Sequence, residues 1–489
     1  MLLEANNHRL YMARSNQQFF PAKFVGSPFR LLTWVIIAIS FIYTTYTLSL
    51  LYYSSSLSFN QPSPVSTGEG EPTALRHIVF GIAASENLWK TRKNYIKLWY
   101  HPNRTRGVVW LDKPVSLTIS DRALLPPIKI SSDTTRFPFT NPTGHRSAIR
   151  ISRIISETLA LNFTDVRWFV MCDDDTVFLP DNLVGVLADY DHRQYYYIGT
   201  SSESHYQNIN FSNRMAYGGG GFAISHALAV LLSKNLDSCI HRYPTLYGSD
   251  ERIQACMAEL GVPLTRHSGF HQYDVYGEIF GLLAAHPVVP LVSFHHLDLL
   301  SPVFPKHTRV GGLKKIFQGP VSLDSAGVMQ QSICYDVDGN WTVGVAWGYS
   351  VQIVKGVVSP RTMEIPIRTF LHWSNNWDNY AYAFTTRGLP LDHCKRPIVY
   401  YLMSSMLDEK TNMTVTKYGN PQRLLFIGSD HICDETPVEE MVVYKLRDPD
   451  IWKRTPRRNC CKVEKKNKKM NIHVGVCRDG DYEEMMKLQ

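Results

Sequence analysis

Charged residues are scarce in this sequence, and neither sign of charge dominates it. Of the 489 residues 19% are charged, below the roughly 25% of an average folded protein, while 44% are hydrophobic, an ordinary fraction. The net charge of +8 arises in residues 453–469, which hold nine Lys and Arg against one acid; elsewhere the two signs balance. This composition predicts a mostly folded chain and argues against nucleic-acid binding through a generally basic surface. The basic segment itself is interpreted as a solvated tail.

Long hydrophobic runs are also missing, with one exception near the N-terminus. Residues 31–53 carry no charge over 23 positions, and as a helix they would span roughly 34 Å, enough for a tilted bilayer crossing. The other apolar stretch, residues 278–300, is interrupted by prolines, histidines and an acid. Basic residues precede the uncharged run and the next charge is Glu69, so the positive-inside rule leaves the N-terminus cytosolic. We therefore predict a single-pass type II signal anchor with the rest of the chain in a lumen.

Sequons and cysteines agree with a lumenal chain. All five Asn-x-Ser/Thr sequons lie beyond the uncharged run, at Asn103, Asn162, Asn210, Asn340 and Asn412. Of nine cysteines, six lie beyond residue 330, an even number that suits disulfides in an oxidising compartment: Cys334, Cys394, Cys433, Cys460, Cys461 and Cys477. Their pairing does not follow from the sequence.

Composition and periodicity divide the chain into five parts. Residues 1–30 are a cytosolic tail, residues 31–53 the anchor, and residues 54–74 a stem rich in Ser, Pro, Gly and Gln. Over residues 75–305 short apolar runs alternate with helix-like segments such as residues 88–99 and 147–161, which predicts an α/β domain with a mainly parallel sheet. In residues 306–489 the alternation of apolar side chains from Trp341 to Val354 indicates a strand, and with the cysteines it predicts a smaller β-rich, disulfide-tied module.

Three consecutive carboxylates follow an apolar run of strand length in RWFVMCDDDTVF, at Asp173, Asp174 and Asp175. Acids placed together repel one another unless a cation lies among them. Ligands of open α/β sheets bind at the carboxyl ends of the strands, and oxygen ligands suit Mg²⁺ or Mn²⁺. A solvated turn is the alternative. The missing glycine and final Glu exclude an EF-hand loop.

A second segment, YGGGGFAIS, has four glycines where the backbone can approach a ligand closely, and it matches neither a P-loop nor a dinucleotide-binding motif. Further along, YGSDERIQAC places Asp250 and Glu251 at the start of a helix, where they either cap it or supply a general base. Cys239 and Cys256 bracket this loop, as a disulfide or as buried thiols.

The adjacent pair His295 and His296 in SFHHLD is the last signal. In an extended segment their side chains point in opposite directions, so only one reaches the Asp run. A purely structural pair is the alternative.

These signals together resemble the fringe-type β-1,3-glycosyltransferases, and among them the plant fringe-related group. The phrases that carry the resemblance are WKTRKNYIKLWY, TRGVVWLD, MCDDDTVF, YGGGGFAIS, GSDERIQAC and SFHHLD, all within residues 75–305. The resemblance implies a GT-A fold, a UDP-sugar donor, Mn²⁺ with Mg²⁺ as an alternative, and inversion at the anomeric carbon. It also implies Golgi residence.

The resemblance also assigns roles. Asp175 and Asp173 would hold the metal, with His296 completing the site and His295 as the alternative. Asp250 would be the catalytic base, with Glu251 as the alternative. Residues expected at the donor are Asp174, Arg92, Asp112, Arg153, Gly219 and Gly220.

The expected function is transfer of a hexose or N-acetylhexosamine from a UDP-sugar to a hydroxyl of a glycan or glycoprotein, forming a β-1,3 linkage. The competing hypothesis is a catalytically silent carbohydrate-binding or scaffold protein on the same fold.

Overall fold

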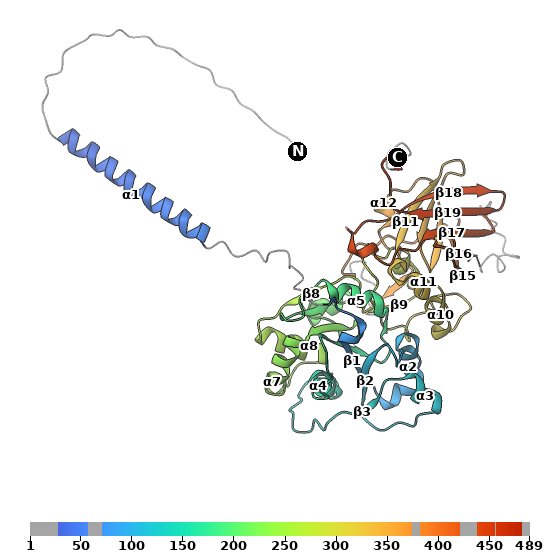
Figure 1. The fold of residues 1–489 in the computed structure, drawn as a ribbon, viewed down its shortest axis with the longest axis horizontal. Coiled ribbons are helices and arrows are strands. Elements are labelled where there is room, and N and C mark those ends of the chain that lie inside the picture. Colours follow the sequence, from blue (N-terminus) through green and yellow to red (C-terminus); the bar gives the residue numbers. More distant parts are fainter. Residues whose placement is uncertain (1–27, 57–70, 374–381, 421–437, 455, 482–489) are drawn as a thin grey trace, which may run out of the picture. The chain divides into compact units, whose positions relative to one another are not determined.

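Strands and helices alternate from residue 78 to residue 266 and build a mixed sheet with helices on both faces (Figure 1). The structure is a computed structural model, and it describes residues 28–56, 71–373, 382–420, 438–454 and 456–481. The sheet has seven strands in the order β3-β2-β1-β4-β7-β6-β8. Their bounds are β1 (Ile78–Ala83), β2 (Arg106–Leu111), β3 (Ile128–Ile130), β4 (Trp168–Asp173), β6 (Tyr197–Gly199), β7 (Phe222–Ser225) and β8 (Leu264–Arg266).

One half of this sheet is parallel, as predicted, and the other half is mixed. Strands β3, β2, β1 and β4 run parallel. Strand β7 then lies antiparallel to both β4 and β6, and β8 returns parallel to β6. The carboxyl ends of β1, β2 and β4 therefore meet at one edge, where ligands of such sheets bind.

Alternate residues of the strands face two separate apolar cores, as the period of two requires. Val79, Val108 and Phe169 pack on one face with helices α4 (Ser147–Leu159), α7 (His226–Arg242) and α8 (Ser249–Glu259). Ile78, Val109 and Val170 pack on the other with α2 (Glu86–Trp99) and α5 (Pro180–Ala188). The predicted helical segments 88–99 and 147–161 correspond to α2 and α4.

The C-terminal part forms an eight-stranded sheet in the order β11-β12-β13-β15-β16-β17-β19-β18. Neighbours are antiparallel except β17 and β19. The strands are β11 (Gln331–Asp336), β12 (Trp341–Ala346), β13 (Ser350–Lys355), β15 (Ile398–Asp408), β16 (Met413–Gly419), β17 (Glu440–Leu446), β18 (Cys460–Lys466) and β19 (Lys469–Gly475). The apolar core on the α2 face continues without a break into this sheet, which contributes Val343, Tyr349 and Tyr400.

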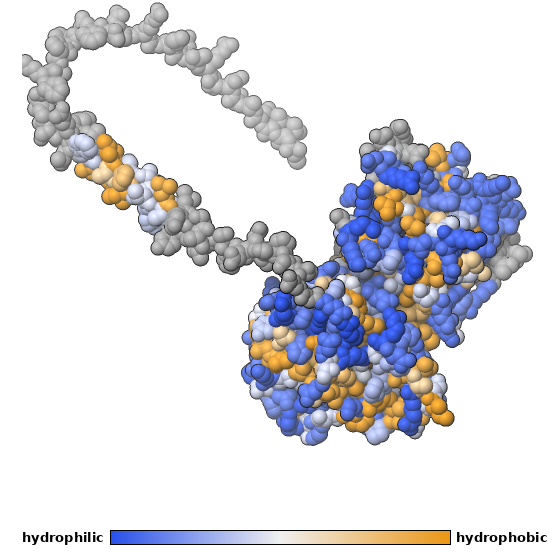
Figure 2. Space-filling model, viewed as in Figure 1, coloured by the Kyte–Doolittle hydropathy of each residue, from blue (hydrophilic) through white to orange (hydrophobic). Residues whose placement is uncertain are grey.

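Two sequence predictions for this part are wrong in detail. The single strand expected from Trp341 to Val354 is a hairpin of β12 and β13, because Gly348 turns the chain with a φ of 79°. Part of the basic segment expected as a tail forms β18 and the first residue of β19, in a region whose surface is hydrophilic in Figure 2. Acidic neighbours partly neutralise it, with Lys468 lying 2.9 Å from Glu439 and Lys469 3.2 Å from Glu440.

The connection from β13 to β15 leaves its own sheet. Within it, α12 (Pro360–Met363) is followed by β14 (Phe370–His372), which pairs antiparallel with β9 (Val275–Gly277) of the α/β part. A further short ladder joins β5 (Val177–Phe178) to β10 (Ser293–Phe294). The remaining helices are α3 (Ile119–Leu124), α6 (His205–Asn210), α9 (Phe280–Ala284), α10 (Arg309–Ile316) and α11 (Ser322–Asp324).

Residues 70–489 form one unit, and residues 1–69 form another that contains helix α1 (Pro28–Ser56). Helix α1 includes the segment predicted to cross a membrane. Among the residues that the structure describes, no helix combines the length and apolarity needed for a membrane span. The predicted anchor is therefore not shown. The cytosolic tail up to residue 27, most of the stem and Cys433 lie outside the described residues.

Disulfides join Cys239 to Cys256, Cys334 to Cys461 and Cys460 to Cys477, and Cys394 is disulfide-bonded as well. The disulfide predicted around the Asp250 loop is thus confirmed. The asparagines of all five sequons, Asn103, Asn162, Asn210, Asn340 and Asn412, are exposed.

Candidate functional site

The three consecutive acids stand where β4 ends at the carboxyl edge of the sheet. Asp173 is the last residue of β4, and the next two lie in the tight turn before β5. The Thr176 side chain closes this turn, accepting a hydrogen bond from the Asp173 backbone N–H (3.0 Å) and donating one to the Gly219 carbonyl (2.7 Å). The turn is therefore fixed to the glycine segment before any ligand binds.

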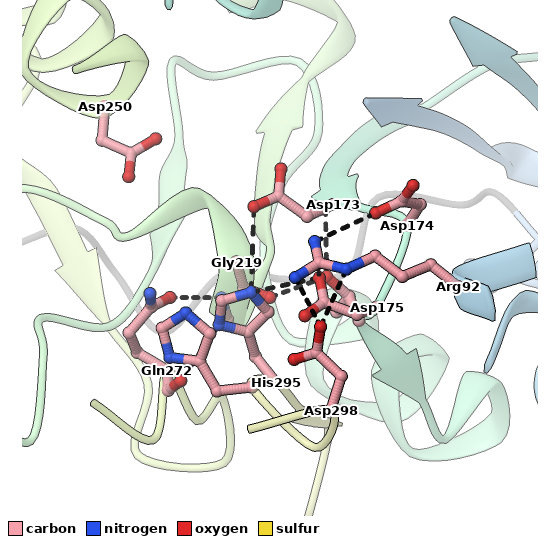
Figure 3. Close-up of polar contacts among 12 residues, drawn as sticks. Arg92, Asp173, Asp174, Asp175, Gly219, Asp250, Gln272, His295 and Asp298 are labelled. Atoms are coloured by element: carbon pink, nitrogen blue, oxygen red, sulfur yellow. Dashed lines mark hydrogen bonds and ion pairs between the residues drawn. The ribbon is translucent and has the colours of Figure 1, made fainter. Parts of the chain in front are cut away.

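Asp173, Asp175 and His295 come together from distant parts of the chain and can hold a metal ion, because one ligand atom of each lies within 4.8 Å of the others. The His295 Nε2 atom is 3.3 Å from Asp175 Oδ1 and 3.8 Å from Asp173 Oδ2 (Figure 3). The Nδ1 atom lies 3.1 Å from the Gln272 carbonyl, which can only accept, so Nδ1 carries the proton and Nε2 faces the carboxylates.

The donor set fits a divalent cation. Asp175 is 0% exposed, and its Oδ2 atom has no hydrogen-bond partner among the described residues. Burial opposes a charge on His295, but the carboxylates of Asp175 and Asp173 outweigh burial and raise the pKa of His295 to about 9. An imidazolium thus balances the acids here. Because a ligating imidazole must be neutral, metal binding would release this proton.

His296, the residue assigned to the metal from the sequence, faces away from the acids. Its Nδ1 atom is 3.2 Å from Asp274 Oδ1, and its ring stacks on Trp373 at 4.6 Å between ring centroids. Strand β10 ends at Phe294, and His296 has a φ of 55°, so the chain turns at this residue. The structure therefore corrects the assignment to His295, the alternative.

Arg92 of α2 binds the acids on the other side of His295 (Figure 3). Its Nη1 atom lies 3.2 Å from Asp174 and 3.1 Å from Asp175, and its Nη2 atom lies 2.6 Å from Asp298. Burial opposes the charge on Arg92, yet the three carboxylates outweigh burial and raise its pKa. Burial, with repulsion from Asp175, raises the pKa of Asp174 to about 7. Arg92 thus lies beside the acids that follow β4, and its role at the donor stays a prediction.

Each of the first two glycines of YGGGG makes room for a site residue. A Cβ atom on Gly219 would lie 2.0 Å from Cε1 of His295, and one on Gly218 would lie 2.7 Å from Oδ1 of Asp250. The backbone N–H of Gly220 donates to Oε1 of Gln272 (2.6 Å). The glycine segment therefore seats the histidine and the carboxylate side by side, and this packing explains its composition.

Asp250 and Glu251 begin helix α8 but serve different purposes. Glu251 accepts hydrogen bonds from the backbone N–H groups of Tyr247 (2.7 Å) and Gly248 (3.2 Å), so it caps the helix. Asp250 instead lines a small cavity of about 20 Å³ together with Asp173 and Gly218. Burial and repulsion from Asp173 raise the pKa of Asp250 to about 7, which suits a group that exchanges protons.

The remaining two donor candidates are not equivalent. Asp112 follows β2 at the carboxyl edge and accepts a hydrogen bond from the Glu86 N–H at the start of α2 (2.8 Å). Arg153 instead binds Asp237 of α7 (2.8 Å), which makes it a structural residue away from the acids. Its neighbour Arg150 reaches the sheet edge, donating to the carbonyls of Ala84 (2.9 Å) and Trp110 (3.0 Å). Arg153, expected at the donor, therefore pairs with α7 and does not contact the acids at the end of β4.

Several residues of the site gave no sequence signal. Gln272 orients His295 and Gly220, and Asp274 binds His296. Glu203 accepts a hydrogen bond from the Tyr273 N–H (2.7 Å) and lies 3.3 Å from His271 Nδ1. They stand in loops without a motif, so only the fold identifies them.

Comparisons with solved structures find distant similarity to a number of chains, among them two enzymes. An active-site mutant of LgtC is 14% identical, with 50% of this chain and 94% of that chain covered and a TM-score of 0.29. The mannosyltransferase PcManGT from Pyrobaculum calidifontis, in complex with GDP-Man and Mn²⁺, is 14% identical, with 59% and 74% covered and a TM-score of 0.27. TM-scores this low establish neither a shared fold nor a shared function. No curated protein matches the chain.

The profile of one protein family, described as "Protein of unknown function, DUF604", matches residues 207–461, more than half of the sequence. The matched region begins before the glycine segment, includes Asp250 and His295, and ends at the start of β18. It thus joins part of the candidate site to the C-terminal sheet. The chain belongs to the DUF604 family.

Proposed function

We propose that this protein is a metal-dependent glycosyltransferase that uses a nucleotide sugar. The observation that carries the proposal is the convergence of Asp173, Asp175 and His295, with Asp250 on the wall of the same cavity as Asp173. Two carboxylates and an oriented imidazole form a donor set for a divalent ion. A separate carboxylate with a pKa near neutrality supplies the second requirement, a general base.

The metal-site residues act on the leaving group of the proposed reaction, and Asp250 acts on the nucleophile. Mn²⁺, or Mg²⁺ in its place, would be held by Asp173, Asp175 and His295 and would supply Lewis-acid stabilisation of the departing diphosphate. Arg92 fixes Asp174 and Asp298 beside them. Asp250, as a carboxylate, takes the proton of the acceptor hydroxyl as its oxygen attacks the sugar. A single attack of this kind inverts the anomeric carbon.

The finer features of the proposal rest on the fringe-type sequence phrases. They support UDP as the nucleotide, a hexose or N-acetylhexosamine as the sugar, a hydroxyl of a glycan or glycoprotein as the acceptor, and a β-1,3 linkage. The Gly218 and Gly219 backbone, which packs against Asp250 and His295, would form the wall between donor and acceptor.

The proposed location is the Golgi lumen, with the chain held as a single-pass type II membrane protein. Exposed sequons and five disulfide-bonded cysteines among the described residues beyond 330 support an oxidising, glycosylating compartment. The sensitivity of the expressed protein to an N-glycosidase, and its protection from protease in sealed vesicles, test this location and topology.

The first experiment measures Mn²⁺ binding and release of UDP from a panel of UDP-sugars by the full-length chain. We expect turnover of one donor, loss of Mn²⁺ binding in Asp175→Ala and His295→Ala, and a rate lowered about 10²- to 10⁴-fold in Asp250→Asn with Mn²⁺ binding intact.

Two neighbours provide matched controls for these variants. His296→Ala should keep Mn²⁺ binding, and Glu251→Gln should keep turnover, because neither side chain faces the metal-site carboxylates. UDP-sugar binding without turnover on any acceptor would favour the silent carbohydrate-binding alternative. Mn²⁺ binding that survives Asp175→Ala would contradict the metal site.

A further inference from the structure

The C-terminal part reaches the candidate site through the long connection between β13 and β15. Strand β14 pairs with β9, placing His372 opposite Val275. Further along, Tyr382 bridges to Ser204, and the Ala383 N–H donates to the Glu203 carbonyl (3.0 Å). The connection is therefore attached to the α/β part at two places, through β14 and through Ala383.

The residue that follows β14, Trp373, places its aromatic ring against His296, the neighbour of the metal-site residue His295. Trp373 follows β14 directly and stacks on His296, with 4.6 Å between centroids and 12° between planes. It also stacks on Tyr276, at 4.7 Å and 7°. The His296 ring lies 3.9 Å from that of His295. Trp373, His296 and Tyr276 are all partly exposed, so part of this stack is open to solvent.

The two sides of His295 differ in chemical character. In Figure 3, Arg92 and Asp174 lie on one side of His295, and Asp250 and Gln272 lie on the other. Gln272 leads to the aromatic stack, because its amide donates to Asp274 (3.3 Å), which binds His296. The charged side would suit a diphosphate once a divalent cation held by Asp173, Asp175 and His295 offsets its carboxylates. Aromatic rings pack on the apolar C–H groups of pyranose sugars while polar groups bind the hydroxyls. The partly exposed stack of Tyr276, Trp373 and His296 presents such rings beside His295.

We infer that Trp373 and Tyr276 form the acceptor subsite and that the acceptor is a pyranose sugar. The inference rests on the proposed glycosyltransferase function and names its acceptor class. It gives the C-terminal sheet a direct part in that function, since the connection within this sheet supplies the ring. His296, excluded as a metal ligand by its position, becomes the positioning residue that links this ring to His295.

The test measures sugar binding apart from turnover. Methyl pyranosides of glucose, galactose, mannose and N-acetylglucosamine are titrated into the full-length chain with Mn²⁺ and UDP present, and saturation-transfer NMR detects contact with their C–H protons. We expect binding of at least one pyranoside, with a dissociation constant raised about tenfold or more in Trp373→Ala and largely restored in Trp373→Phe. Leu371→Ala, in the same strand with a side chain 57% exposed, is the matched control and should bind like the wild type.

The outcomes separate this inference from the proposed function. If Mn²⁺ and UDP bind but no pyranoside does, or if Trp373→Ala leaves pyranoside binding unchanged, the acceptor subsite is wrong and the transferase proposal stands. If pyranosides bind through Trp373 but Mn²⁺ and UDP do not, the transferase proposal fails and the sugar site stands. Weaker UDP binding in Trp373→Ala, with pyranoside binding intact, would assign the ring to the nucleotide base and overturn the inference.

Discussion

At the scale of single residues, the most informative feature is the split between Asp250 and Glu251, two adjacent acids with different surroundings. The Glu251 carboxylate accepts hydrogen bonds at the start of α8 and so caps the helix. Asp250 lies against Gly218 in the cavity that Asp173 also lines. Burial and the Asp173 charge raise the pKa of Asp250 to about 7. Only the carboxylate form can accept a proton, so the protonated fraction below this pH is inactive.

The pH dependence of turnover follows from this pKa. We expect kcat/KM to rise with pH through about 7 and to level off above it, because Asp250 deprotonates over this range. In Asp250→Asn the small residual rate should lack this rise. The measurement is a pH–rate profile at saturating Mn²⁺ from pH 5.5 to 8.5. A rise that persists in Asp250→Asn would assign the titration to another group, with Asp174 the first candidate.

A second titratable residue, Glu203, affects stability. Burial, together with the nearby Asp274 charge, raises the pKa of Glu203 from 4.5 to about 8. The folded chain therefore holds a proton that the unfolded chain releases above pH 4.5, so stability is lost as pH rises from 4.5 to about 8. Glu203→Gln imitates the protonated acid without titrating. It should match the wild type near pH 4.5 and exceed its free energy of unfolding at pH 8.5 by about 1.4 kcal/mol or more, the value of one pKa unit.

Denaturant unfolding of both proteins at several pH values checks this prediction. Glu409→Gln, at an exposed position between β15 and β16, is the matched control and should leave the pH dependence unchanged. If Glu203→Gln parallels the wild type across the whole range, Glu203 is ionised in the folded protein and the prediction is wrong.

At the scale of elements, the turn Gly218–Gly220 and the following β7 determine where His295 lies. Because a Cβ atom on Gly219 would lie 2.0 Å from the His295 ring, Gly219→Ala must displace that ring. We expect the Mn²⁺ dissociation constant to rise about 10- to 100-fold, as when a metal ligand loses its orientation. Isothermal titration with Mn²⁺ measures the change. Gly185→Ala in α5 is the matched control, since nothing lies within 4 Å of its Cβ position.

The control also carries its own expectation. Gly185 is exposed within a helix, where alanine is favoured by about 0.5–1 kcal/mol, so Gly185→Ala should stabilise the protein and leave Mn²⁺ binding unchanged. Mn²⁺ binding that also survives Gly219→Ala would show that the His295 ring does not need this space.

The sequence predicted individual helices and strands better than it predicted how they face and pair with one another. Helices α2 and α4 and the buried strand before the acids follow from periodicity, which is a local property. The choice between His295 and His296 depends on a positive φ at one residue, and the pairing of Arg153 with α7 depends on the direction in which α4 faces the sheet. Neither the backbone turn nor the direction of α4 follows from the residues next to it in the sequence. The position of Trp373 is even harder to predict from the sequence, because it depends on β14 pairing with β9 of the α/β part.

At the scale of the whole molecule, the α/β part and the C-terminal sheet share one apolar core. Phe304 and Phe280 pack against Tyr349 of the C-terminal sheet, at 5.7 Å and 6.3 Å between ring centroids. Hydrogen bonds cross the same boundary, from the Gln331 amide to the Ala284 carbonyl (3.0 Å) and from the Gln330 amide to the Val289 carbonyl (2.8 Å). The family match, which extends from residue 207 to residue 461, likewise covers both parts.

This shared core predicts that the α/β part does not fold alone. In a chain that ends at residue 305, Phe280 and Phe304 lose their cover, and exposing a buried Phe costs about 1.5–3 kcal/mol. Two or three such losses are comparable to the 5–15 kcal/mol that hold a typical domain folded. We therefore expect a chain of residues 71–305 to be insoluble or to unfold without a cooperative transition, whereas residues 71–489, which keep the whole unit, should unfold cooperatively. Circular dichroism during thermal unfolding, and limited proteolysis of the full-length chain, distinguish the two cases. A stable proteolytic fragment ending near residue 305 would mean that the C-terminal sheet is a separable module, and the contribution of Trp373 to the site would then depend on docking between two independent domains.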